Sequence, residues 1–373
     1  MRAVVIGAGI GGIAAAIAMR CAGLEVEVHE RAGELREVGA GIGLWPNALR
    51  VLDRIGLGDA VRAAALPLSD ACVFAWNGEP MVQVSLDGMR DRGAWTVVLH
   101  RATLLELLIT ALGRERVRLG RLCTGFDQDS QGVVAKFSGG ERAPGDFLIG
   151  ADGLYSAVRA QLWGDRKPLY AGYTAWRGVV RFDHTRLMPG ETWGAGARFG
   201  QFPMADGQVY WFACMNAPEH EHSPMGEKAA LREVFGRFHD PIPELIEATE
   251  ERTILRNDIC DRPALRRWGR GRVTLLGDAA HPMTPNLGQG ACQALEDALV
   301  LAECVNGASD VPSALRRYEK RRMARANAMV IHSRRFGSLA QLEHPLLIAA
   351  RNAIMRRIPQ RMRARGMEAM VGF

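Results

Sequence analysis

The chain has 373 residues, of which 48% are hydrophobic and 24% are charged. That length exceeds one small domain, and the composition is typical of a globular enzyme rather than a disordered chain. No run of about 18 apolar residues occurs, which argues against a membrane-spanning helix.

The net charge of +6 is unevenly distributed along the chain. Residues 316–373 hold 14 Lys and Arg against three acidic residues, a net charge of +11, which leaves −5 for the rest of the chain. The basic character therefore belongs to the C-terminal segment, and this argues against a general nucleic-acid-binding surface. Glycines interrupt the apolar N-terminal stretch, so it is not typical of a signal peptide, and we expect a cytoplasmic protein whose seven cysteines are reduced thiols.

The N-terminal residues follow the order strand, glycine-rich loop, helix, strand. Hydrophobic periodicity predicts a buried strand at 3–6, an Ala- and Ile-rich helix at 11–22 and a second strand at 24–30. This order is the opening unit of a dinucleotide-binding fold.

The loop after the first strand has the spacing that a dinucleotide requires. Gly7 permits the tight turn, Gly9 lets the backbone approach a pyrophosphate, and Gly12 lets helix and strand pack closely. Glu30 ends the second strand, where its carboxylate is placed to bind ribose hydroxyls, and the adjacent Arg31 is assigned to the same cofactor. The sequence therefore predicts a bound dinucleotide at the N-terminus of the first helix.

The following residues alternate between helical and strand-like patterns. The pattern predicts helices at 46–55 and 101–112, strand-like sequence at 71–84, and a meander of strands at 117–119, 132–137 and 147–149. Residues 165–257 carry aromatic and β-branched runs between Gly and Pro turns, which predicts the antiparallel sheet of a second domain. Beyond it we expect a short helix at 243–249, a strand at 272–276 that returns to the first domain, and helices at 289–305, 313–339 and 346–362.

Two further motifs follow predicted strands. Asp152 and Gly153 form a turn between the strand at 147–149 and a helix. Asp278 follows the strand at 272–276, at the strand end where open α/β sheets bind ligands, and suits a hydroxylated chain such as ribityl. Residues 285–291 then open a long helix, whose free N–H groups suit the electron-rich edge of a reduced flavin.

In this order and spacing, the three motifs closely resemble those of the single-component FAD-dependent aromatic hydroxylases, flavin monooxygenases that share the p-hydroxybenzoate hydroxylase fold. The resemblance covers roughly residues 1–335. Segments 39–49, 100–104 and 170–178 are similar to the branch that holds salicylate, hydroxynicotinate and urate hydroxylases and zeaxanthin epoxidase.

The resemblance implies an α/β fold, in which a Rossmann-like FAD-binding domain is interleaved with an antiparallel-sheet substrate domain and followed by C-terminal helices. The implied FAD-binding domain comprises residues 1–70, 96–164 and 258–335, the substrate-binding domain residues 71–95 and 165–257, and the basic amphipathic C-terminal segment residues 336–373. The implied cofactors are FAD, NADH or NADPH as co-substrate, and O2. The implied reaction hydroxylates an aromatic or heteroaromatic substrate through a flavin C4a-hydroperoxide.

The resemblance also implies roles for individual residues. Those expected to bind the cofactor are Gly7, Gly9, Gly12 and Glu30 at the ADP half, Arg101 near the ribityl and phosphate region, Asp152 and Gly153 at the motif tied to FAD and the nicotinamide cofactor, Asp278 at the ribityl chain, and Gly288, Gln289, Gly290 and Ala291 against the flavin ring.

Candidates for the substrate site lie on the second-domain sheet and beside the flavin. Arg198 and Tyr210 occupy positions similar to an arginine and a tyrosine near the substrate in urate-hydroxylase-like members, and Pro285 lies in the loop that shapes the cavity. Trp45 lies beside the expected flavin cleft and is a candidate for its wall. The alternatives are a solvated strand residue for Arg198 and core aromatics for Tyr210 and Trp45. Where urate-type members carry an acid, this chain has Asn286, which cannot act as a base and so argues against urate.

The C-terminal segment interleaves apolar residues with six arginines between positions 346 and 365. Such a basic amphipathic helix suits peripheral contact with an anionic membrane, which would favour a lipophilic substrate. The alternative is packing against its own domain or against the partner in a homodimer. No cluster of His, Cys and carboxylates has metal-ligand spacing, so no metal is expected.

Three other functions remain open on this fold. The chain could be a flavin reductase or dehydrogenase that does not use O2, an oxidoreductase or epoxidase acting on a lipophilic polyene or quinone, or a non-catalytic carrier on an FAD-type fold. The presence of Asp278 and of the motif at 288–290 argues against the carrier.

Overall fold

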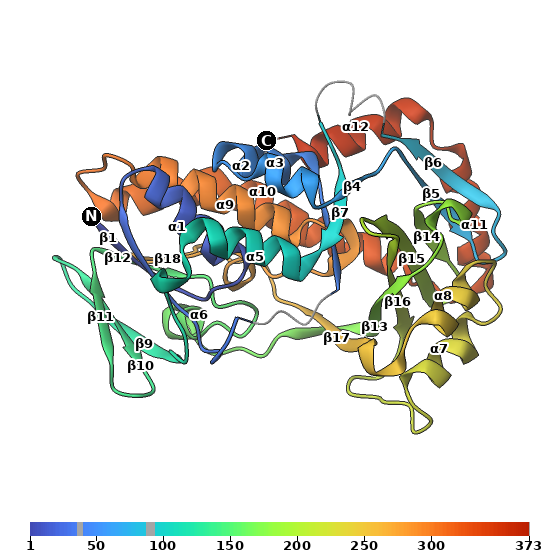
Figure 1. Cartoon of the computed structure of the whole chain (residues 1–373), viewed down its shortest axis with the longest axis horizontal. Helices are drawn as coiled ribbons and strands as arrows, with labels where there is room; N and C mark the ends of the chain where they lie inside the picture. Colours follow the sequence, from blue (N-terminus) through green and yellow to red (C-terminus); the bar gives the residue numbers. More distant parts are fainter. Residues whose placement is uncertain (36–39, 87–93, 373) are drawn as a thin grey trace.

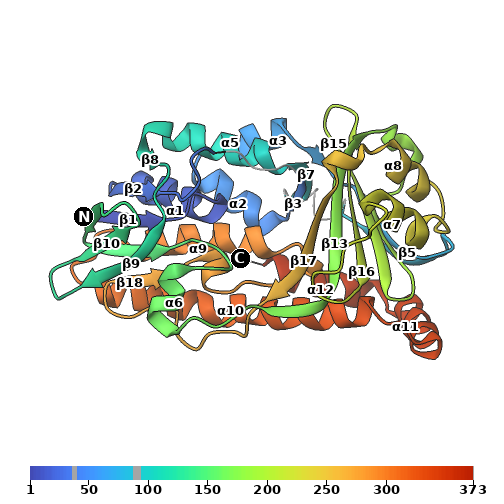
Figure 2. The same ribbon diagram turned by 90° about the horizontal axis from the view of Figure 1, so that it is seen from below.

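The computed structural model describes residues 1–35, 40–86 and 94–372. Two large sheets lie toward opposite ends of the long axis of the molecule (Figure 1). The long helix α10 (Val311–Ala340) runs beneath both of them (Figure 2).

The first sheet is parallel and has five strands in the order β18-β12-β1-β2-β8. Its strands are β1 (Arg2–Ile6), β2 (Glu25–His29), β8 (Val117–Arg118), β12 (Phe147–Gly150) and β18 (Val273–Leu275). Strands β1 and β12 inside the sheet and β18 at its edge are almost wholly buried, as expected for a parallel sheet covered on both faces.

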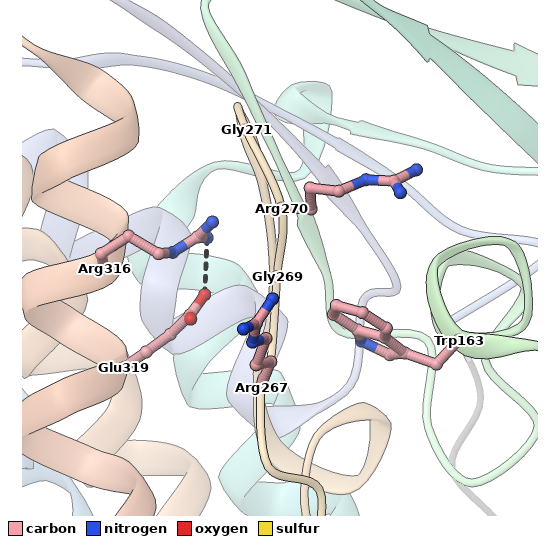
Figure 3. Close-up of a pocket in the computed structure, with 7 residues that line it drawn as sticks. All are labelled: Trp163, Arg267, Gly269, Arg270, Gly271, Arg316 and Glu319. Carbon is pink, nitrogen blue, oxygen red and sulfur yellow. Dashed lines mark hydrogen bonds and ion pairs between the residues drawn. The ribbon is translucent and has the colours of Figure 1, made fainter.

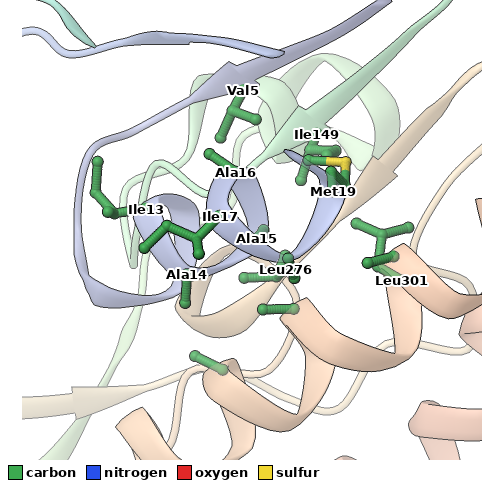
Figure 4. Close-up of a cluster of buried hydrophobic side chains, with 14 of the residues drawn as sticks. Val5, Ile13, Ala14, Ala15, Ala16, Ile17, Met19, Ile149, Leu276 and Leu301 are labelled. Carbon is green, nitrogen blue, oxygen red and sulfur yellow. The ribbon is translucent and has the colours of Figure 1, made fainter. Parts of the chain in front are cut away.

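Helix α1 (Ile10–Cys21) packs between this sheet and helix α9 (Gly290–Val305). Figure 4 shows its alanine and isoleucine side chains among Val5, Ile149, Leu276 and Leu301. The small alanines let the two helices approach closely, so the glycine-rich loop and the start of α9 are held in one rigid layer.

The predicted meander at 117–149 is wrong. Strand β8 pairs in parallel with β2, and β12 pairs in parallel with β1, so both belong to the first sheet. Only β10 (Val133–Phe137) lies in a separate antiparallel sheet, between β9 (Cys123–Gln128) and β11 (Arg142–Gly145). The fully buried β12 needs neighbours that cover both its faces, which a three-stranded surface meander does not provide.

The second large sheet has seven strands in the order β17-β13-β16-β15-β14-β5-β6. Its strands are β5 (Asp70–Ala75), β6 (Pro80–Ser85), β13 (Leu169–Arg181), β14 (Gly190–Trp193), β15 (Ala197–Met204), β16 (Gln208–Asn216) and β17 (Leu255–Asp261). Neighbours are antiparallel, as predicted, except that β14 and β5 pair in parallel because β5 comes from the earlier segment of the chain. Helices α7 (Glu227–Phe235) and α8 (Ile242–Ala248) cover one face of this sheet with a separate hydrophobic cluster.

The remaining elements connect these layers. They are the small sheet of β3 (Gly41–Leu44), β4 (Leu66–Pro67) and β7 (Val97–His100), the helices α2 (Pro46–Arg54), α3 (Gly58–Ala63), α5 (Arg101–Leu112), α6 (Ala157–Trp163), α11 (Pro345–Arg357) and α12 (Gln360–Val371), and short 3-10 turns at Arg114–Arg116, His184–Arg186, Glu251–Thr253, Gly277–Ala279 and Pro285–Leu287.

The single helix predicted at 346–362 is wrong, because α11 ends at Arg357 and α12 begins at Gln360. Pro359 cannot continue a helix, and Ile358 before it adopts an extended backbone, as a residue preceding proline prefers.

Within the described ranges, no helix combines the length and the apolar character needed to cross a membrane. The domain boundaries stay a prediction; β17 continues past residue 257, and α10 continues past residue 335. Of the predicted segments, Gly39, residues 87–93 and Phe373 lie outside the described part of the chain.

Candidate active site

The glycine-rich loop between β1 and α1 lies at the carboxyl edge of the parallel sheet. Gly7 has a φ of +107°, and a Cβ there would overlap the carbonyl oxygen of Ala151 in the neighbouring turn. A Cβ on Gly12 would overlap the carbonyl oxygen of Gly7. By contrast, a Cβ on Gly9 would have no heavy atom within 4 Å. Two glycines are therefore needed by the fold, whereas the third leaves open space at a helix N-terminus.

Glu30 lies beside this loop, and its side chain is fixed by the backbone. Its Oε2 accepts a hydrogen bond from the Ala8 N–H at 2.8 Å, and its Oε1 accepts one from the Ala32 N–H at 2.9 Å. Each carboxylate oxygen keeps a free lone pair, which suits hydroxyl donors such as those of a ribose. Arg31 follows at an exposed position.

The second motif mainly stabilises a helix. The Asp152 carboxylate accepts hydrogen bonds from Ser156 Oγ at 2.5 Å and from the backbone N–H of Ala157 at 2.8 Å, so it caps α6. Burial raises the pKa of Asp152. Gly153 has a φ of +78°, and a Cβ there would meet no heavy atom within 4 Å.

Arg159 connects the second motif to the third. Its Nη1 donates to the carbonyl oxygens of Ala279 and Ala280, both at 3.1 Å, and the side chain is buried. Burial lowers the pKa of Arg159 to about 10. Sequence reasoning gave this residue no role, although it ends the segment that contains Asp152 and Gly153.

Asp278 projects from the 3-10 turn after β18. Its side chain is accessible to solvent, but the protein atoms packed around it disfavour the charged carboxylate and raise its pKa. The nearby His281 and Arg101 partly offset that effect. Arg101 is the first residue of α5, so the two predicted ribityl-binding residues converge from separate elements. An exposed carboxylate near the Arg101 side chain suits hydroxyl donors.

Unlike Asp278, His281 is buried. Its Nε2 lies 2.6 Å from Asp297 Oδ2, and both side chains are fully buried. Arg322 Nε lies 2.7 Å from the other Asp297 oxygen. Although burial disfavours the charged carboxylate, His281 and Arg322 hold the pKa of Asp297 below its usual value. His281 therefore belongs to a buried ion network that supports the turn.

The loop at 285–291 combines exposed and buried residues. Pro285 and Gly288 are exposed, and a Cβ on Gly290 would meet no heavy atom within 4 Å. Gln289 is buried, and its Oε1 accepts a hydrogen bond from Asn47 Nδ2 at 3.0 Å. Ala291, half-buried, follows in the first turn of α9.

Trp45 lies against this loop, because its Nε1 would be 3.1 Å from a Cβ placed on Gly288. Its side chain is partly buried and joins the cluster that contains Met204 and Tyr210. The structure thus places Trp45 between the 285–291 loop and the second sheet.

One face of the seven-stranded sheet, opposite α7 and α8, carries the polar candidates. By strand register, this Arg198 face includes Tyr173, Arg177, Arg198, Tyr210, Phe212 and Cys214. Arg198 is 1% exposed, which excludes the solvated alternative. Its Nη1 lies 3.3 Å from Glu191 Oε2, and its Nη2 donates to Asn286 Oδ1.

The charge of Arg198 is stabilised where it is buried. Although burial disfavours the guanidinium, Cys214 and Glu191 hold the pKa of Arg198 above its usual value. The Tyr173 hydroxyl also donates to Asn286 Oδ1, at 3.0 Å. The Arg198 face therefore meets the 285–291 loop at Asn286. Sequence reasoning assigned no role to Tyr173, although it lies in the segment similar to the urate-hydroxylase branch.

Tyr210 lies further along the same face. Its ring packs so closely on strand β3 that a Cβ on Gly41 would overlap it. Burial raises the pKa of Tyr210 to about 12, and Arg177 and Arg101 oppose that shift. The hydroxyl is therefore protonated at neutral pH and can donate a hydrogen bond.

A separate cavity of about 340 Å3 lies away from these residues. Figure 3 shows Arg267, Arg270 and Trp163 around it, with Arg316 paired to Glu319 at 2.6 Å. Its Arg270–Gly271 loop precedes β18, whereas Asp278 follows β18, so this cavity lies at the opposite edge of the parallel sheet. In the described residues, no group of three or more His, Cys, Asp and Glu side chains could hold a metal ion.

The residues at the carboxyl edge fit FAD. Gly9, Gly153 and Gly290 border open space in which a Cβ would have no neighbour, which allows a phosphate or a ring to approach the backbone. Glu30 and Asp278 offer carboxylates to the two hydroxylated parts of the molecule. An elongated dinucleotide from Glu30 to the 285–291 loop satisfies this arrangement.

Comparison with known proteins gives consistent matches. A model of the FAD binding domain family matches residues 1–333. Aurachin C monooxygenase/isomerase from Stigmatella aurantiaca is 42% identical over 357 residues, which cover 94% of this chain and 92% of that protein. FAD-dependent urate hydroxylase from Klebsiella pneumoniae is 37% identical over 343 residues, covering 90% and 89%. The crystal structure of Klebsiella pneumoniae HpxO complexed with FAD and uric acid superposes with a TM-score of 0.94 at 33% identity, covering 100% of this chain and 96% of that chain.

Proposed function

The chain belongs to the FAD binding domain family, and on that premise we propose that its substrate is an aromatic or heteroaromatic molecule held between the Arg198 face and the 285–291 loop. The expected relationship to FAD-dependent hydroxylases of the urate-hydroxylase branch is confirmed. The protein is accordingly a flavoprotein monooxygenase that uses FAD, NAD(P)H and O2. The reductase and carrier alternatives are therefore set aside.

We assign the cofactor-binding roles to the carboxyl edge of the parallel sheet. Gly7, Gly9, Gly12, Glu30 and Arg31 would hold the ADP half. Arg101 and Asp278 would bind the ribityl and phosphate region, with Asp152 and Gly153 at the adjoining turn, and Gly288, Gln289, Gly290 and Ala291 would lie against the ring. When bound, FAD takes two electrons from NAD(P)H and supplies the means to transfer one oxygen atom of O2 to the substrate.

The observation that supports this substrate site is the hydrogen bond that Arg198 donates to Asn286. Arg198 is buried and charged, and its Nε donates to no oxygen or nitrogen in the described residues. A buried donor without an acceptor costs free energy, which a substrate oxygen such as a ring carbonyl or phenolate would recover. Glu191 already balances part of the charge, so this acceptor need not be a full carboxylate.

The surrounding residues would orient the ring and exclude water. Tyr210 would donate a hydrogen bond to a second polar atom of the substrate, and Trp45 and Pro285 would form the wall beside the 285–291 loop. Asn286 is an amide with both of its polar atoms engaged, so it orients Arg198 and cannot remove a proton from the substrate. For this reason urate is not the substrate that we propose.

The proposal is tested by NAD(P)H oxidation and O2 uptake in the presence of phenols, hydroxybenzoates, hydroxypyridines, purines and quinolones. A true substrate raises both rates and gives a product 16 mass units heavier. We expect Arg198→Gln to lower kcat/KM about 10- to 100-fold, as the loss of a charge-assisted hydrogen bond predicts, with FAD absorbance retained.

The matched control is Arg181→Gln at the exposed end of β13, which should match the wild type. An Arg198→Gln enzyme with unchanged kcat/KM would refute the assignment of Arg198 to the substrate.

We also propose that the protein is cytoplasmic, since all seven of its cysteines are free thiols. For the C-terminal segment, packing on its own domain, contact with the partner in a homodimer and peripheral contact with a membrane remain the proposed roles.

A further inference from the structure

Helix α11 buries Met355 against the protein but leaves three large apolar side chains on the face that points away from it. Leu346 is 74% exposed, Leu347 53% and Ile354 64%, whereas Arg351 on the inner face is 3% exposed and lies 5.2 Å above the Trp193 ring. A helix that only packed on its own domain would bury most of its large apolar side chains. Figure 2 shows α11 at the extremity of the molecule, below the seven-stranded sheet.

The charges on the two C-terminal helices divide between structural and outward-facing arginines. Arg351 donates to the Ala340 carbonyl oxygen at 3.1 Å, Arg356 pairs with Glu79 at 2.6 Å, and Arg363 donates to the Gln83 carbonyl oxygen at 3.3 Å. Arg357, whose Nη1 donates to the Ala353 carbonyl oxygen at 3.2 Å, is exposed, as are Arg361 and Arg365 and, at 63%, Met362. Together Leu346, Leu347, Ile354 and Met362 with these three arginines form what we term the outer stripe.

The inner side of α12 forms a wall of the candidate active site. Met367, Met370 and Val371 pack in the same cluster as Trp45 and Tyr210. Two arginines from other helices bind the C-terminal end of α12. Arg325 Nη2 donates to the Met370 carbonyl oxygen at 2.8 Å, and Arg50 donates to the Val371 carbonyl oxygen. Helix α12 thus carries Arg361, Met362 and Arg365 of the outer stripe and also contacts the proposed substrate site through Met367, Met370 and Val371.

We propose that the outer stripe binds the surface of an anionic lipid bilayer and that the enzyme takes a lipophilic aromatic substrate from that bilayer past α12. The substrate part rests on the proposed function, whereas the lipid part does not. Leucine and isoleucine side chains enter the boundary between headgroups and acyl chains, and each nearby arginine adds attraction to anionic headgroups.

Charge complementarity favours a bilayer over a second copy of this chain. Between residues 345 and 372 the only acidic residue is Glu368, whereas six arginines lie there, among them the exposed Arg357, Arg361 and Arg365 of the outer stripe. Two copies that met stripe to stripe would bring these arginines together, and repulsion between like charges would oppose the contact.

The first test is co-sedimentation of the holoenzyme with vesicles. Wild type should bind vesicles that contain phosphatidylglycerol, bind pure phosphatidylcholine at least tenfold less, and dissociate as salt rises. The double variant Leu346→Ser/Ile354→Ser and the double variant Arg361→Glu/Arg365→Glu should each reduce the bound fraction at least tenfold. Their controls are Leu122→Ser/Met225→Ser and Arg54→Glu/Arg252→Glu, which alter exposed residues elsewhere and should bind as wild type does.

Retained flavin content and thermal unfolding would show that the variants fold. Equal partitioning of the wild type onto both vesicle types, or full binding by the stripe variants, would overturn the proposal. A dimer of the wild type in solution that Leu346→Ser/Ile354→Ser converts to monomer would also overturn it, by assigning the stripe to a second copy of the chain.

The second test separates lipid binding from catalysis. With anionic vesicles present, kcat/KM for a long-chain alkylated aromatic substrate should fall at least tenfold in the stripe variants, while that for its short-chain water-soluble analogue stays unchanged. Equal effects on both substrates would refute delivery from the bilayer. Absence of hydroxylation in wild type and variants alike would refute the proposed function and leave the vesicle result standing.

Discussion

The cofactor edge and the Arg198 face use different kinds of group to build a site. At the carboxyl edge of the parallel sheet, backbone groups and missing side chains create the space, as at Gly9 and Gly290, and the carboxylate of Glu30 is itself held by backbone N–H groups. On the Arg198 face the groups proposed to bind substrate are long side chains: Glu191 and Asn286 position Arg198, and the Tyr210 ring packs on strand β3. The first kind of site depends on local backbone geometry and the second on which strands become neighbours.

The 285–291 loop joins the two regions and rests on a third arrangement, a buried ion network. Arg322 contacts both Glu296 and Asp297, and Asn47 Nδ2 donates to Glu296 Oε1 at 2.6 Å and to Gln289 in the loop. Charges in the interior thus fix a loop that offers backbone groups to the cofactor edge and the Asn286 side chain to the Arg198 face. Each of the three arrangements should fail in its own way when it is changed.

The largest effect should come from the ion network. Arg322→Met removes the arginine that pairs with both buried carboxylates and leaves Glu296 to Arg325 and Asp297 to His281, so we expect the free energy of unfolding to fall by about 3–5 kcal/mol. Urea unfolding of the holoenzyme measures it. Arg321→Met is the matched control, since Arg321 is half exposed and pairs with Glu303 at the surface, and should cost about 1 kcal/mol or less.

The same variant has a predictable pH dependence. The folded-state pKa of Asp297 lies below its usual value, so its ionisation stabilises the fold above that usual value, and this contribution is lost as the pH falls toward the folded-state pKa. The difference between wild type and Arg322→Met should therefore shrink under acid conditions. A difference that stays constant down to pH 3 would show that Arg322 acts through packing rather than charge.

The next effect concerns the cofactor edge alone. Gly9→Ala adds a Cβ where no protein atom lies within 4 Å, so the apoprotein should keep its free energy of unfolding to within about 1 kcal/mol. The same Cβ occupies the approach of the pyrophosphate, so FAD affinity should fall at least about tenfold. Flavin fluorescence titration of the apoprotein measures it.

Gly33→Ala supplies the comparison for this change. A Cβ on Gly33 also meets no heavy atom within 4 Å, but Gly33 is exposed and lies beyond Glu30, outside the phosphate loop. If both variants bind FAD as wild type does, the space beside Gly9 does not hold the phosphates.

The contrast between the two regions also explains what could be predicted from sequence. The spacing of Gly7, Gly9 and Gly12 predicted the loop, strand and helix that the structure contains, because the pattern reports local backbone needs. Helix α5 was predicted with its bounds, because an apolar run ends at Gly113, whose φ is +95°.

Strand partners were not predictable in this way. The wrong prediction of a meander at 117–149 shows that hydrophobic alternation predicts a strand but not the strand with which it pairs. Strands β8 and β12 pair with strands more than 80 residues away in sequence. The roles of Arg159 and Tyr173 were missed for the same reason, since their contacts lie at Ala279 and Asn286. A residue whose partner is distant in sequence gives no local signal.

The smallest effect tests whether the Arg198 face works through single polar groups. Tyr210→Phe removes one hydroxyl and leaves the ring packed on Gly41, so kcat/KM should fall about two- to tenfold, the value of one neutral hydrogen bond, with FAD affinity unchanged. Because the pKa of Tyr210 is about 12, the hydroxyl is a donor up to about pH 10, and both enzymes should give the same shape of pH profile below that value. Tyr170→Phe is the matched control, because its hydroxyl donates to the Ala217 carbonyl oxygen at 2.6 Å near the far end of the sheet. An ionisation near pH 8 that Tyr210→Phe abolishes would instead make Tyr210 a proton acceptor, and the Arg198 face would then contain a base as well as donors.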